Sequence, residues 1–220
     1  MRNTHTPIAV EGFPFIAIAA AFTAVVAFLY WRTCSAWLLA LVCFLLLLTG
    51  FIVFFFRNPQ RSGTTDERAV LAPADGVIVY LGDAHEEHLG QEMSKVSIFM
   101  SVFNAHVNRA PLTGRVVDTF YVSGKFLDVR DERATFENER LGIILEAARG
   151  MKIVVVQVAG LIARRIVCYA KKGDTLERGR RYGLIRFGSR LDVYLPKGTD
   201  IRVAMGEKTR CGETVLGILP

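Results

Sequence analysis

The sequence predicts a mainly β (α+β) protein, in which a compact β-barrel or β-sandwich domain follows an N-terminal helical membrane hairpin. Only three charged side chains precede Arg57, so the first part of the chain is almost wholly apolar, whereas charges occur throughout the rest. Beyond Ala69 the chain breaks into short runs of β-branched and aromatic residues separated by Gly, Pro and Asp, which is typical of strands and turns. The composition therefore divides the chain into a hairpin, residues 1–56, and a β domain, residues 57–220.

Two apolar, uncharged stretches, residues 13–31 and 35–56, form the predicted hairpin, which either spans the bilayer or dips into one leaflet. Each has about the 20 residues that a helix needs to cross the hydrocarbon core of a bilayer. A cleaved signal peptide is the alternative for the first stretch, but a second apolar stretch follows almost at once, with no small-residue cleavage site between them. Arginines follow the second stretch, and positive charge beside a span marks the cytoplasmic side. We therefore expect a chain held in the cell membrane with its β domain on the cytoplasmic side.

The strands of the β domain are predicted from alternating apolar and polar residues between turn signals. Residues 128–140 are charged and lack this alternation, so either a loop or one short helix is expected there. A weak internal repeat closes the chain, because a Gly-acid turn, a second Gly and an apolar strand occur from residue 172 and again from residue 205. Such turn-strand units favour the corners of a barrel or sandwich. The predicted strands are residues 77–81, 96–100, 115–122, 143–145, 153–158, 166–169, 182–187 and 190–195.

Charge and metal-ligand spacing narrow the functional classes. The net charge is +6, yet no block of consecutive Lys or Arg suggests a nucleic-acid partner, and a basic domain beside a bilayer more plausibly faces anionic lipid headgroups. His85 and His88, in a polar loop over residues 83–90, have a spacing compatible with a metal site. No third ligand accompanies them, so a solvated loop is the better interpretation and no metal is expected.

Cysteine usage indicates a reducing compartment. The four cysteines show no Cys-x-x-Cys spacing, and two of them lie in or beside the apolar stretches. Free, buried thiols are therefore expected. The four are Cys34, Cys43, Cys168 and Cys211.

Three residue types that a nucleophilic serine requires occur at separate points of the chain. Ser189 follows Gly188 at the joint between two predicted strands, His106 follows an apolar strand, and Asp75 lies in a Pro-Ala-Asp-Gly turn. They supply a hydroxyl, an imidazole base and a carboxylate that can orient the base. Each also has an ordinary structural interpretation, since Gly-Ser and Asp-Gly are common turn pairs and a single His often serves only as a hydrogen-bonding residue. No G-x-S-x-G elbow is present, which disfavours an α/β-hydrolase.

Several motifs occur in a fixed order along the β domain. They are FFRNP at 55–59, APADG at 72–76, FNAHVNR at 103–109, GKF at 124–126, ENER at 137–140, QVAGLIARR at 157–165 and GRRYGLIRFGSRLDVYLP at 179–196. Together they make the chain resemble the phosphatidylserine decarboxylase proenzymes of the short bacterial and archaeal kind. In that family the Gly-Ser pair is cut by the protein itself, and the serine becomes a covalent pyruvoyl cofactor.

The resemblance implies that Gly188 and Ser189 form the cleavage site, giving a β chain of residues 1–188 and an α chain of residues 189–220. It also implies that Asp75 and His106 are the supporting acid and base. Longer family members carry a second His three residues after the first, and that position holds an arginine here.

The implied reaction is the decarboxylation of phosphatidylserine to phosphatidylethanolamine through a Schiff base with the pyruvoyl ketone, which acts as an electron sink. Substrate and product both stay in the bilayer, which gives the hairpin a purpose. Lys125 and Arg109 are candidates for binding the lipid phosphate. No nucleic-acid partner is expected, and association with further copies of the chain is left open.

A second class of function fits part of the pattern. A non-enzymatic, membrane-anchored β module of the lipoyl or biotinyl-carrier kind, used for protein contacts, would show the same Gly-acid turn repeats. Such a module needs neither Asp75 nor His106, nor an intact Gly188-Ser189 pair. Carrier domains also present a modifiable Lys at a hairpin tip, and no such Lys stands out in this chain. The decarboxylase is therefore the preferred interpretation.

Overall fold

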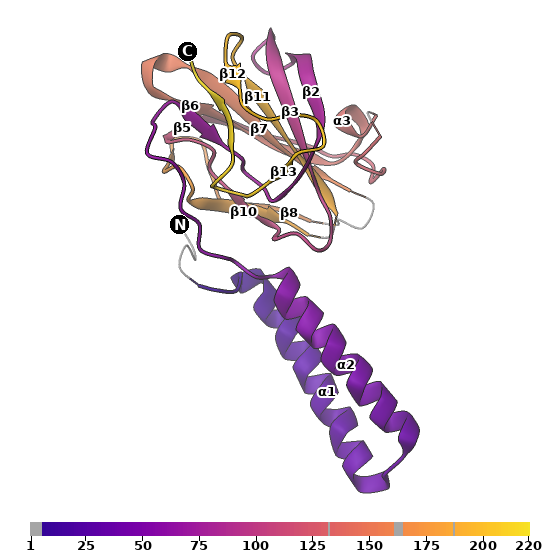
Figure 1. Ribbon diagram of the computed structural model, residues 1–220. Coiled ribbons are helices and arrows are strands. Elements are labelled where there is room, and N and C mark those ends of the chain that lie inside the picture. Colours follow the sequence, from indigo (N-terminus) through magenta and orange to yellow (C-terminus); the bar gives the residue numbers. More distant parts are fainter. Residues whose placement is uncertain (1–5, 132, 161–164, 187) are drawn as a thin grey trace. The chain divides into compact units, whose positions relative to one another are not determined.

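The computed structural model describes residues 6–131, 133–160, 165–186 and 188–220 (Figure 1). It separates into two compact units, a helical one that ends at Gln60 and a β-rich one that begins at Arg61. The predicted fold class, a mainly β protein with two apolar helices at its N-terminus, is confirmed.

The helical unit is an antiparallel pair of apolar helices, α1 (Phe13–Thr33) and α2 (Ala36–Phe55), preceded by the short 3-10 helix η1 (Val10–Gly12). By length and composition both helices could cross a membrane. Cys34 ends α1 in the left-handed conformation, with φ 52°, and donates its backbone N–H to Tyr30 O at 2.8 Å. Two residues thus suffice to turn the chain.

The cysteine prediction is right in one respect and wrong in another. All four thiols are free. Cys34 and Cys43 are exposed rather than buried, because they lie on the hairpin, and Cys168 is half-buried. Only Cys211 lies in the interior of the β-rich unit.

Antiparallel strands form the framework of the described β-rich unit, and each of the eight predicted strands overlaps one of them. The charged stretch at residues 128–140 contains one short helix, α3 (Ala134–Glu137). The strands are β1 (Ala69–Leu71), β2 (Gly76–Glu86), β3 (Gln91–Met100), β4 (Val107–Arg109), β5 (Gly114–Val122), β6 (Arg140–Glu146), β7 (Lys152–Ala159), β8 (Ile166–Cys168), β9 (Thr175–Leu176), β10 (Arg181–Ile185), β11 (Ser189–Leu195), β12 (Asp200–Ile201), β13 (Lys208–Thr209) and β14 (Val215–Ile218).

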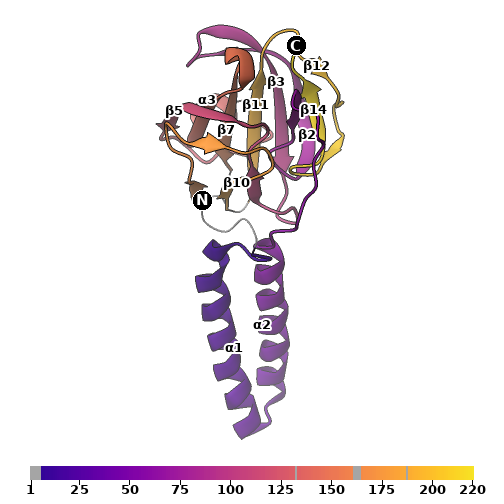
Figure 2. The same ribbon diagram turned by 90° about the vertical axis from the view of Figure 1, so that its left-hand side faces the viewer.

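The strands form one curled eight-stranded sheet and two small sheets (Figures 1 and 2). The large sheet has the order β13-β2-β3-β11-β7-β6-β5-β9, and the small sheets have the orders β1-β14-β12 and β4-β10-β8. These orders reveal two interleaved halves of the same design. Half A consists of β1–β3 and β11–β14, and half B consists of β4–β10. If each strand of one half is replaced by its equivalent in the other half, the order β1-β14-β12 becomes β4-β10-β8. The same replacement turns the order of the large sheet into its own reverse.

The internal repeat in the sequence corresponds to this internal symmetry. Gly173 and Gly179 of half B adopt positive φ values of 95° and 75°, and Gly206 and Gly212 of half A adopt 80° and 77°. Each glycine pair brackets a two-residue strand, β9 or β13. Glycine is favoured at such positions because a side chain would be strained at positive φ. The predicted corners of the β domain are therefore real, and they are equivalent.

The equivalence can be followed along the register of the large sheet. Phe99 on β3 pairs with Val77 on one side and Arg190 on the other. Glu146 on β6 pairs with Arg115 on one side and Lys152 on the other. Arg190 of half A therefore corresponds to Lys152 of half B, and Ser189 corresponds to Met151.

Both faces of strand β11 are covered. Leu191, Val193 and Leu195 belong to the main core between the large and small sheets. The alternate residues Arg190 and Asp192 are buried as well, as is Tyr194, which packs in a second cluster on the opposite face of the sheet. The segment that contains α3 thus covers Arg190, Asp192 and Tyr194, the alternate residues of β11, and these residues are not exposed to water.

Candidate functional site

Ser189 lies at the start of β11, in the middle of the large sheet. It pairs with Met100 on β3 and with Ala159 on β7, and it is fully buried. Its hydroxyl donates to Met100 Sδ at 3.5 Å. Gly188, directly before it, has φ 66°, a conformation that favours glycine. The sequence therefore places a buried hydroxyl next to a carbonyl carbon that no β-carbon shields.

A second glycine makes room for that carbonyl. A Cβ atom added to Gly160 would overlap the carbonyl oxygen of Gly188 and lie 3.1 Å from its carbonyl carbon. The Gly188 carbonyl is consequently packed against the bare Cα of Gly160, at the end of β7. Sequence reasoning noted the motif around Gly160 but assigned this glycine no role. Gly160 could have been recognised in the sequence as a glycine that directly follows a strand. The Gly188-Ser189 motif must pack closely against that glycine.

A chain of buried polar side chains continues behind Ser189. Met100 Sδ also accepts a hydrogen bond from Asn108 Nδ2 at 3.9 Å, and Asn108 Oδ1 accepts one from Gln157 Nε2 at 2.8 Å. Both carboxamides are fully buried. Because buried amides are costly unless they are hydrogen-bonded, this chain fixes the side chain on which the Ser189 hydroxyl rests. Sequence reasoning missed both residues, although each lies within a quoted motif.

His106 is buried and directly precedes β4. Strand β4 pairs with β10, where Val107 lies opposite Leu184, and β10 leads to Gly188. The imidazole is therefore held beside the strand that delivers the Gly-Ser pair. Its Nδ1 lies 2.9 Å from the backbone oxygen of Asn104. A carbonyl can only accept a hydrogen bond, so this contact assigns the proton of the neutral ring to Nδ1 and leaves Nε2 as the basic nitrogen.

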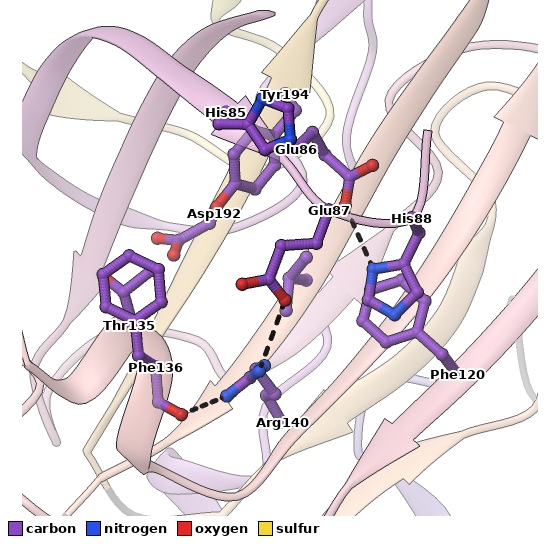
Figure 3. Close-up of a pocket in the computed structure, with 11 residues that line it drawn as sticks. His85, Glu86, Glu87, His88, Phe120, Thr135, Phe136, Arg140, Asp192 and Tyr194 are labelled. Atoms are coloured by element: carbon purple, nitrogen blue, oxygen red, sulfur yellow. Dashed lines mark hydrogen bonds and ion pairs between the residues drawn. The ribbon is translucent and has the colours of Figure 1, made fainter. Parts of the chain in front are cut away.

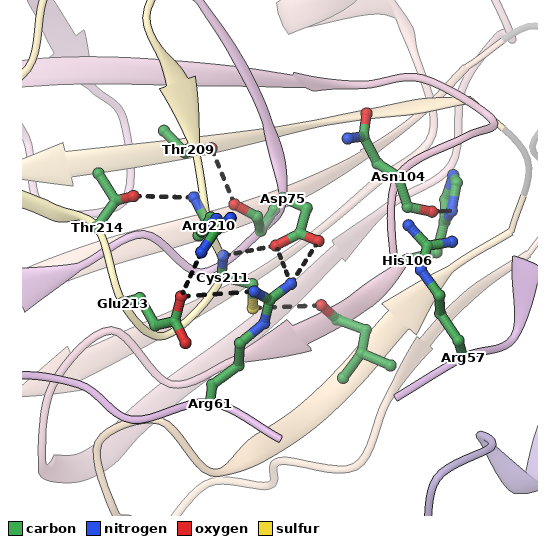
Figure 4. A network of polar contacts seen from close by, with 12 residues as sticks. Arg57, Arg61, Asp75, Asn104, His106, Thr209, Arg210, Cys211, Glu213 and Thr214 are labelled. Carbon is green, nitrogen blue, oxygen red and sulfur yellow. Dashed lines mark hydrogen bonds and ion pairs between the residues drawn. The ribbon is translucent and has the colours of Figure 1, made fainter. Parts of the chain in front are cut away.

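Asp75 has other partners than His106 (Figure 4). Its carboxylate accepts two hydrogen bonds from Arg61 Nη2, at 2.9 and 3.1 Å, and one from the backbone N–H of Cys211 at 2.7 Å. In the described chain it makes no hydrogen bond to His106. The structure thus does not join the three predicted residues into one hydrogen-bonded triad. The half-B counterpart of this arrangement is Thr113, whose hydroxyl accepts the backbone N–H of Arg178 at 3.1 Å.

The two candidate phosphate ligands differ in how accessible they are. Arg109 is buried, and its Nη1 donates to the backbone oxygen of Gly179 at 2.9 Å, so it supports a corner of half B. The Lys125 side chain is 70% exposed and forms an ion pair with Glu137 at 2.8 Å. Of the two, only the Lys125 ammonium can be reached from solvent without rearrangement.

The pair His85 and His88 lies away from this site, around a small pocket of about 30 Å³ (Figure 3). The prediction of a polar loop is wrong for His85, because the β2–β3 ladder continues to Glu86 and places His85 opposite Glu92. His88 stacks on Phe120, with ring centroids 3.4 Å apart, and its Nδ1 lies 3.1 Å from Glu86. Among the described residues no three His, Cys, Asp or Glu side chains form a group able to hold a metal ion.

A larger pocket of about 760 Å³ lies at the turn between β6 and β7, and neither pocket is lined by Ser189, His106 or Asp75. The hydroxyl of Ser189 is enclosed by its own chain, because the residue is fully buried. Cys211, although it touches Asp75, is not a nucleophile at neutral pH, because burial raises the pKa of its thiol to about 12.

Known proteins resemble this chain over its whole length. Residues 48–217 match the family model described as phosphatidylserine decarboxylase. A protein of Geotalea uraniireducens is 67% identical over 220 residues, and one of Geobacter sulfurreducens is 66% identical over 220 residues, each with 100% of both chains covered. A third, of Geobacter metallireducens, is 67% identical over the same span. All three bear the name phosphatidylserine decarboxylase proenzyme, and none of these matches supports a carrier-like module. The chain therefore belongs to the phosphatidylserine decarboxylase family.

Proposed function

We propose that the chain decarboxylates phosphatidylserine to phosphatidylethanolamine, and that it first cleaves its own backbone between Gly188 and Ser189. The observation that carries the proposal is the buried Ser189 hydroxyl beside a glycine with φ 66°. A hydroxyl at this point can reach the preceding carbonyl carbon, which has no β-carbon in its way. The proenzyme names of the relatives support the same order of events.

The cleavage requires only groups that the chain carries, and one water molecule then completes formation of the ketone. Ser189 Oγ attacks the Gly188 carbonyl carbon, an ester bond forms, and the peptide C–N bond breaks while a base takes the hydroxyl proton and the nitrogen gains one. Removal of the Cα proton then expels the Gly188 carboxylate and leaves a dehydroalanine at position 189. Water hydrolyses this group to a ketone with release of ammonia. His106 is the proposed base, acting through Nε2.

The residues around position 189 fit a pyruvoyl group formed in place. Once present, its ketone supplies an electron sink for the loss of CO₂ from an α-amino acid. The protein holds that position through the register of β11 with β3 and β7, which does not depend on the bond that is cut. Cleavage therefore leaves the α chain, residues 189–220, paired on both sides with the β chain, residues 1–188.

The apolar hairpin is proposed to keep the enzyme at the cell membrane, where both lipids reside, with the β-rich unit on the cytoplasmic side. Lys125 is the better candidate for the lipid phosphate because its ammonium is exposed, whereas the Arg109 guanidinium is buried against Gly179. No metal, nucleotide or pyridoxal cofactor is part of the proposal.

The intact mass of the purified full-length protein tests this function. We expect two chains, residues 1–188 and 189–220, with an α chain that resists Edman sequencing because a ketone replaces its amine. Borohydride with added phosphatidylserine should attach lipid to the α chain only. Ser189→Ala should stay uncut and inactive, and Ser189→Thr should cleave slowly because of its added methyl group. An active, unbroken chain with a free serine at position 189 would refute the proposal.

A further inference from the structure

Strand β11 carries a buried ion cluster next to the cleavage site. Arg190 Nε lies 2.8 Å from Asp192 Oδ1, and Arg190 Nη2 lies 3.0 Å from Asp192 Oδ2. Lys95 Nζ approaches the same carboxylate at 3.2 Å. The side chains of Arg190, Asp192 and Lys95 are 5%, 1% and 7% exposed, so the cluster is removed from water. Burial alone would raise the pKa of the Asp192 carboxyl, but Arg190 and Lys95 beside it bring the pKa below its ordinary value, and the carboxylate is ionised.

The framework of the sheet does not require this cluster. The half-B counterpart of Arg190 is Lys152, which is exposed, and the counterpart of Asp192 is Val154, which is buried in an apolar cluster. Buried ion pairs usually contribute less to stability than apolar residues of similar volume. A charge cluster in only one of two equivalent strands therefore calls for a reason other than folding.

The remaining donors of Arg190 reach a different segment of the chain, residues 125–139. Arg190 Nη1 donates to the backbone oxygen of Val129 at 2.8 Å, and Nη2 donates to Thr135 Oγ1 at 2.6 Å. One planar guanidinium thus fixes both Val129 and the first turn of α3, with the directional fork that arginine alone offers.

Val129 reaches the scissile bond in turn. Its side chain is buried, and its Cγ1 would lie 3.1 Å from a Cβ atom on Gly160. The same Cβ would overlap the Gly188 carbonyl oxygen. Val129 and the Gly188 carbonyl therefore meet at Gly160, and Arg190 holds Val129 there.

We propose that Arg190 is a positioning residue that ties the new end of the α chain to the 125–139 segment of the β chain. The inference rests on the proposed function. After cleavage residue 189 loses its covalent link to β10, and Arg190 is the first side chain beyond the new end. Its contacts then run from the α chain to Val129 and Thr135 of the β chain. They keep position 189 in register and keep the 125–139 segment against Gly160.

The test uses two variants of the full-length protein and a matched control. Arg190→Lys keeps a cation beside Asp192 but cannot reach Val129 and Thr135 together. Thr135→Val removes, at a half-buried position, the hydroxyl that accepts from both Arg190 Nη2 and Lys95 Nζ, and it leaves the Arg190–Asp192 ion pair intact. The control Arg202→Lys makes the same change in an exposed ion pair of the α chain, that of Arg202 with Asp200.

We expect Arg190→Lys to fold and to lose about 10-fold to 100-fold in kcat of the processed enzyme, with KM changed less than about threefold, because misplacement of a reacting group by about 1 Å costs this much. Thr135→Val should lose about threefold by the same effect. Arg202→Lys should match the parent. Parent values of kcat for processed Arg190→Lys would overturn the proposal, as would an equal loss in Arg202→Lys.

Limited trypsin digestion tests the tie without any catalysis. Arg130 and Arg133 are exposed within the 125–139 segment, with side chains 69% and 70% exposed, and Arg210, 75% exposed, serves as internal reference. Relative to cleavage after Arg210, cleavage after Arg130 and Arg133 should rise about fivefold or more in Arg190→Lys, because a released segment opens locally. Unchanged cleavage refutes the tie. A parent that is never processed refutes the proposed function instead, and the digestion still reports on Arg190.

Discussion

Half B joins its paired strands β6 and β7 by a short turn, whereas half A leaves the equivalent strands β3 and β11 unjoined. Across the half-B turn, the N–H of Ala147 donates to Met151 O at 2.8 Å. In half A the corresponding positions are Met100 and Ser189, which pair although the chain does not pass directly from one to the other. The chain leaves β3 at Met100, builds all of half B, and returns at Ser189 (Figure 1).

This difference shows where the backbone of a β framework with two equivalent halves can be cleaved without disrupting a strand. Cleavage after Gly188 would separate β10 from β11, which belong to different halves and to different sheets. No strand is interrupted, and the neighbours of β11 stay in place. The candidate residues follow the same logic, since His106 ends the connection from half A to half B, and Gly188 ends the connection back. Function is thus expected where the two halves are joined, and not within either repeat.

The largest expected effect on activity comes from His106, at the end of the connection from half A to half B. His106→Ala should lower self-cleavage, or the turnover of cleaved enzyme, by about 100-fold or more, the usual contribution of a positioned base. The control is His85→Ala, which removes an imidazole that is 58% exposed on β2. A denaturing gel measures cleavage, and release of CO₂ from phosphatidylserine measures turnover. If the His106 variant both cleaves and turns over like the parent, this histidine is structural.

The second connection can be disturbed without touching a reacting group. Gly160→Ala would force a methyl group into the Gly188 carbonyl, and we expect self-cleavage to slow by about 100-fold because the scissile carbonyl must move. Gly82→Ala is the control, since the nearest atoms to its Cβ would belong to the Tyr80 side chain, with the hydroxyl at 3.2 Å. Circular dichroism verifies folding. A folded Gly160 variant that cleaves at the parent rate would show that this packing is irrelevant to the reaction.

Asp75 in half A and Thr113 in half B are equivalent residues, and each accepts a hydrogen bond from a backbone N–H, that of Cys211 or Arg178. Substitutions at these two positions therefore compare the two halves. Asp75→Thr copies half B, keeping an acceptor for the Cys211 N–H while removing the charge that faces Arg61. If Asp75 helps to orient the base, self-cleavage should fall at least about tenfold, even though the cap is kept. Thr113→Ala should lose about 1 kcal/mol of stability, the value of one hydrogen bond, and cleave normally. Parent-like cleavage by Asp75→Thr would reduce Asp75 to a structural cap.

Much of the fold was predictable because it depends on local patterns. Uncharged stretches identify α1 and α2, period-two alternation identifies the long strands, and glycine spacing identifies the corners at Gly173 and Gly206. The shortest strands, such as β4 and β12, were not predicted, because two or three residues carry no periodicity and are fixed by pairing with β10 and β14. The exchange symmetry of the halves is likewise a property of strand order, which no local pattern encodes.

The residue types of the site could be predicted from the sequence, but the hydrogen-bond and ion-pair partners of those residues could not. The chemistry of Ser189, Gly188 and His106 can be inferred from the hydroxyl, the missing side chain and the imidazole. That Asp75 binds Arg61, 14 residues away, and the Cys211 N–H, 136 residues away, depends on tertiary contacts. The burial of Arg190 and Asp192 was equally hidden, because alternation indicates two faces and cannot say that a distant segment covers the polar one.

The smallest expected effect concerns the two thiols of the β-rich unit, Cys211 in half A and Cys168 in half B. Burial raises the pKa of Cys211 from 9.0 to about 12 and that of Cys168 from 9.0 to about 11. Because both folded values lie above the unfolded one, the unfolded state loses its thiol protons first as the pH rises. The stability linked to these thiols is therefore fully present below pH 9 and is lost between there and the folded pKa values.

Urea unfolding of uncut Ser189→Ala protein in detergent, at pH 8 and at pH 10.5, measures this loss without the complication of two chains. The free energy of unfolding should be lower at pH 10.5, and Cys211→Ala added to this background should remove more of the difference than Cys168→Ala. The reason is that the Cys211 thiol is fully buried, with Sγ at 3.2 Å from Pro73 O and 3.4 Å from Val107 O, whereas Cys168 is half-buried. If both variants keep the full pH difference, other groups titrate instead, and the two halves do not differ in this respect.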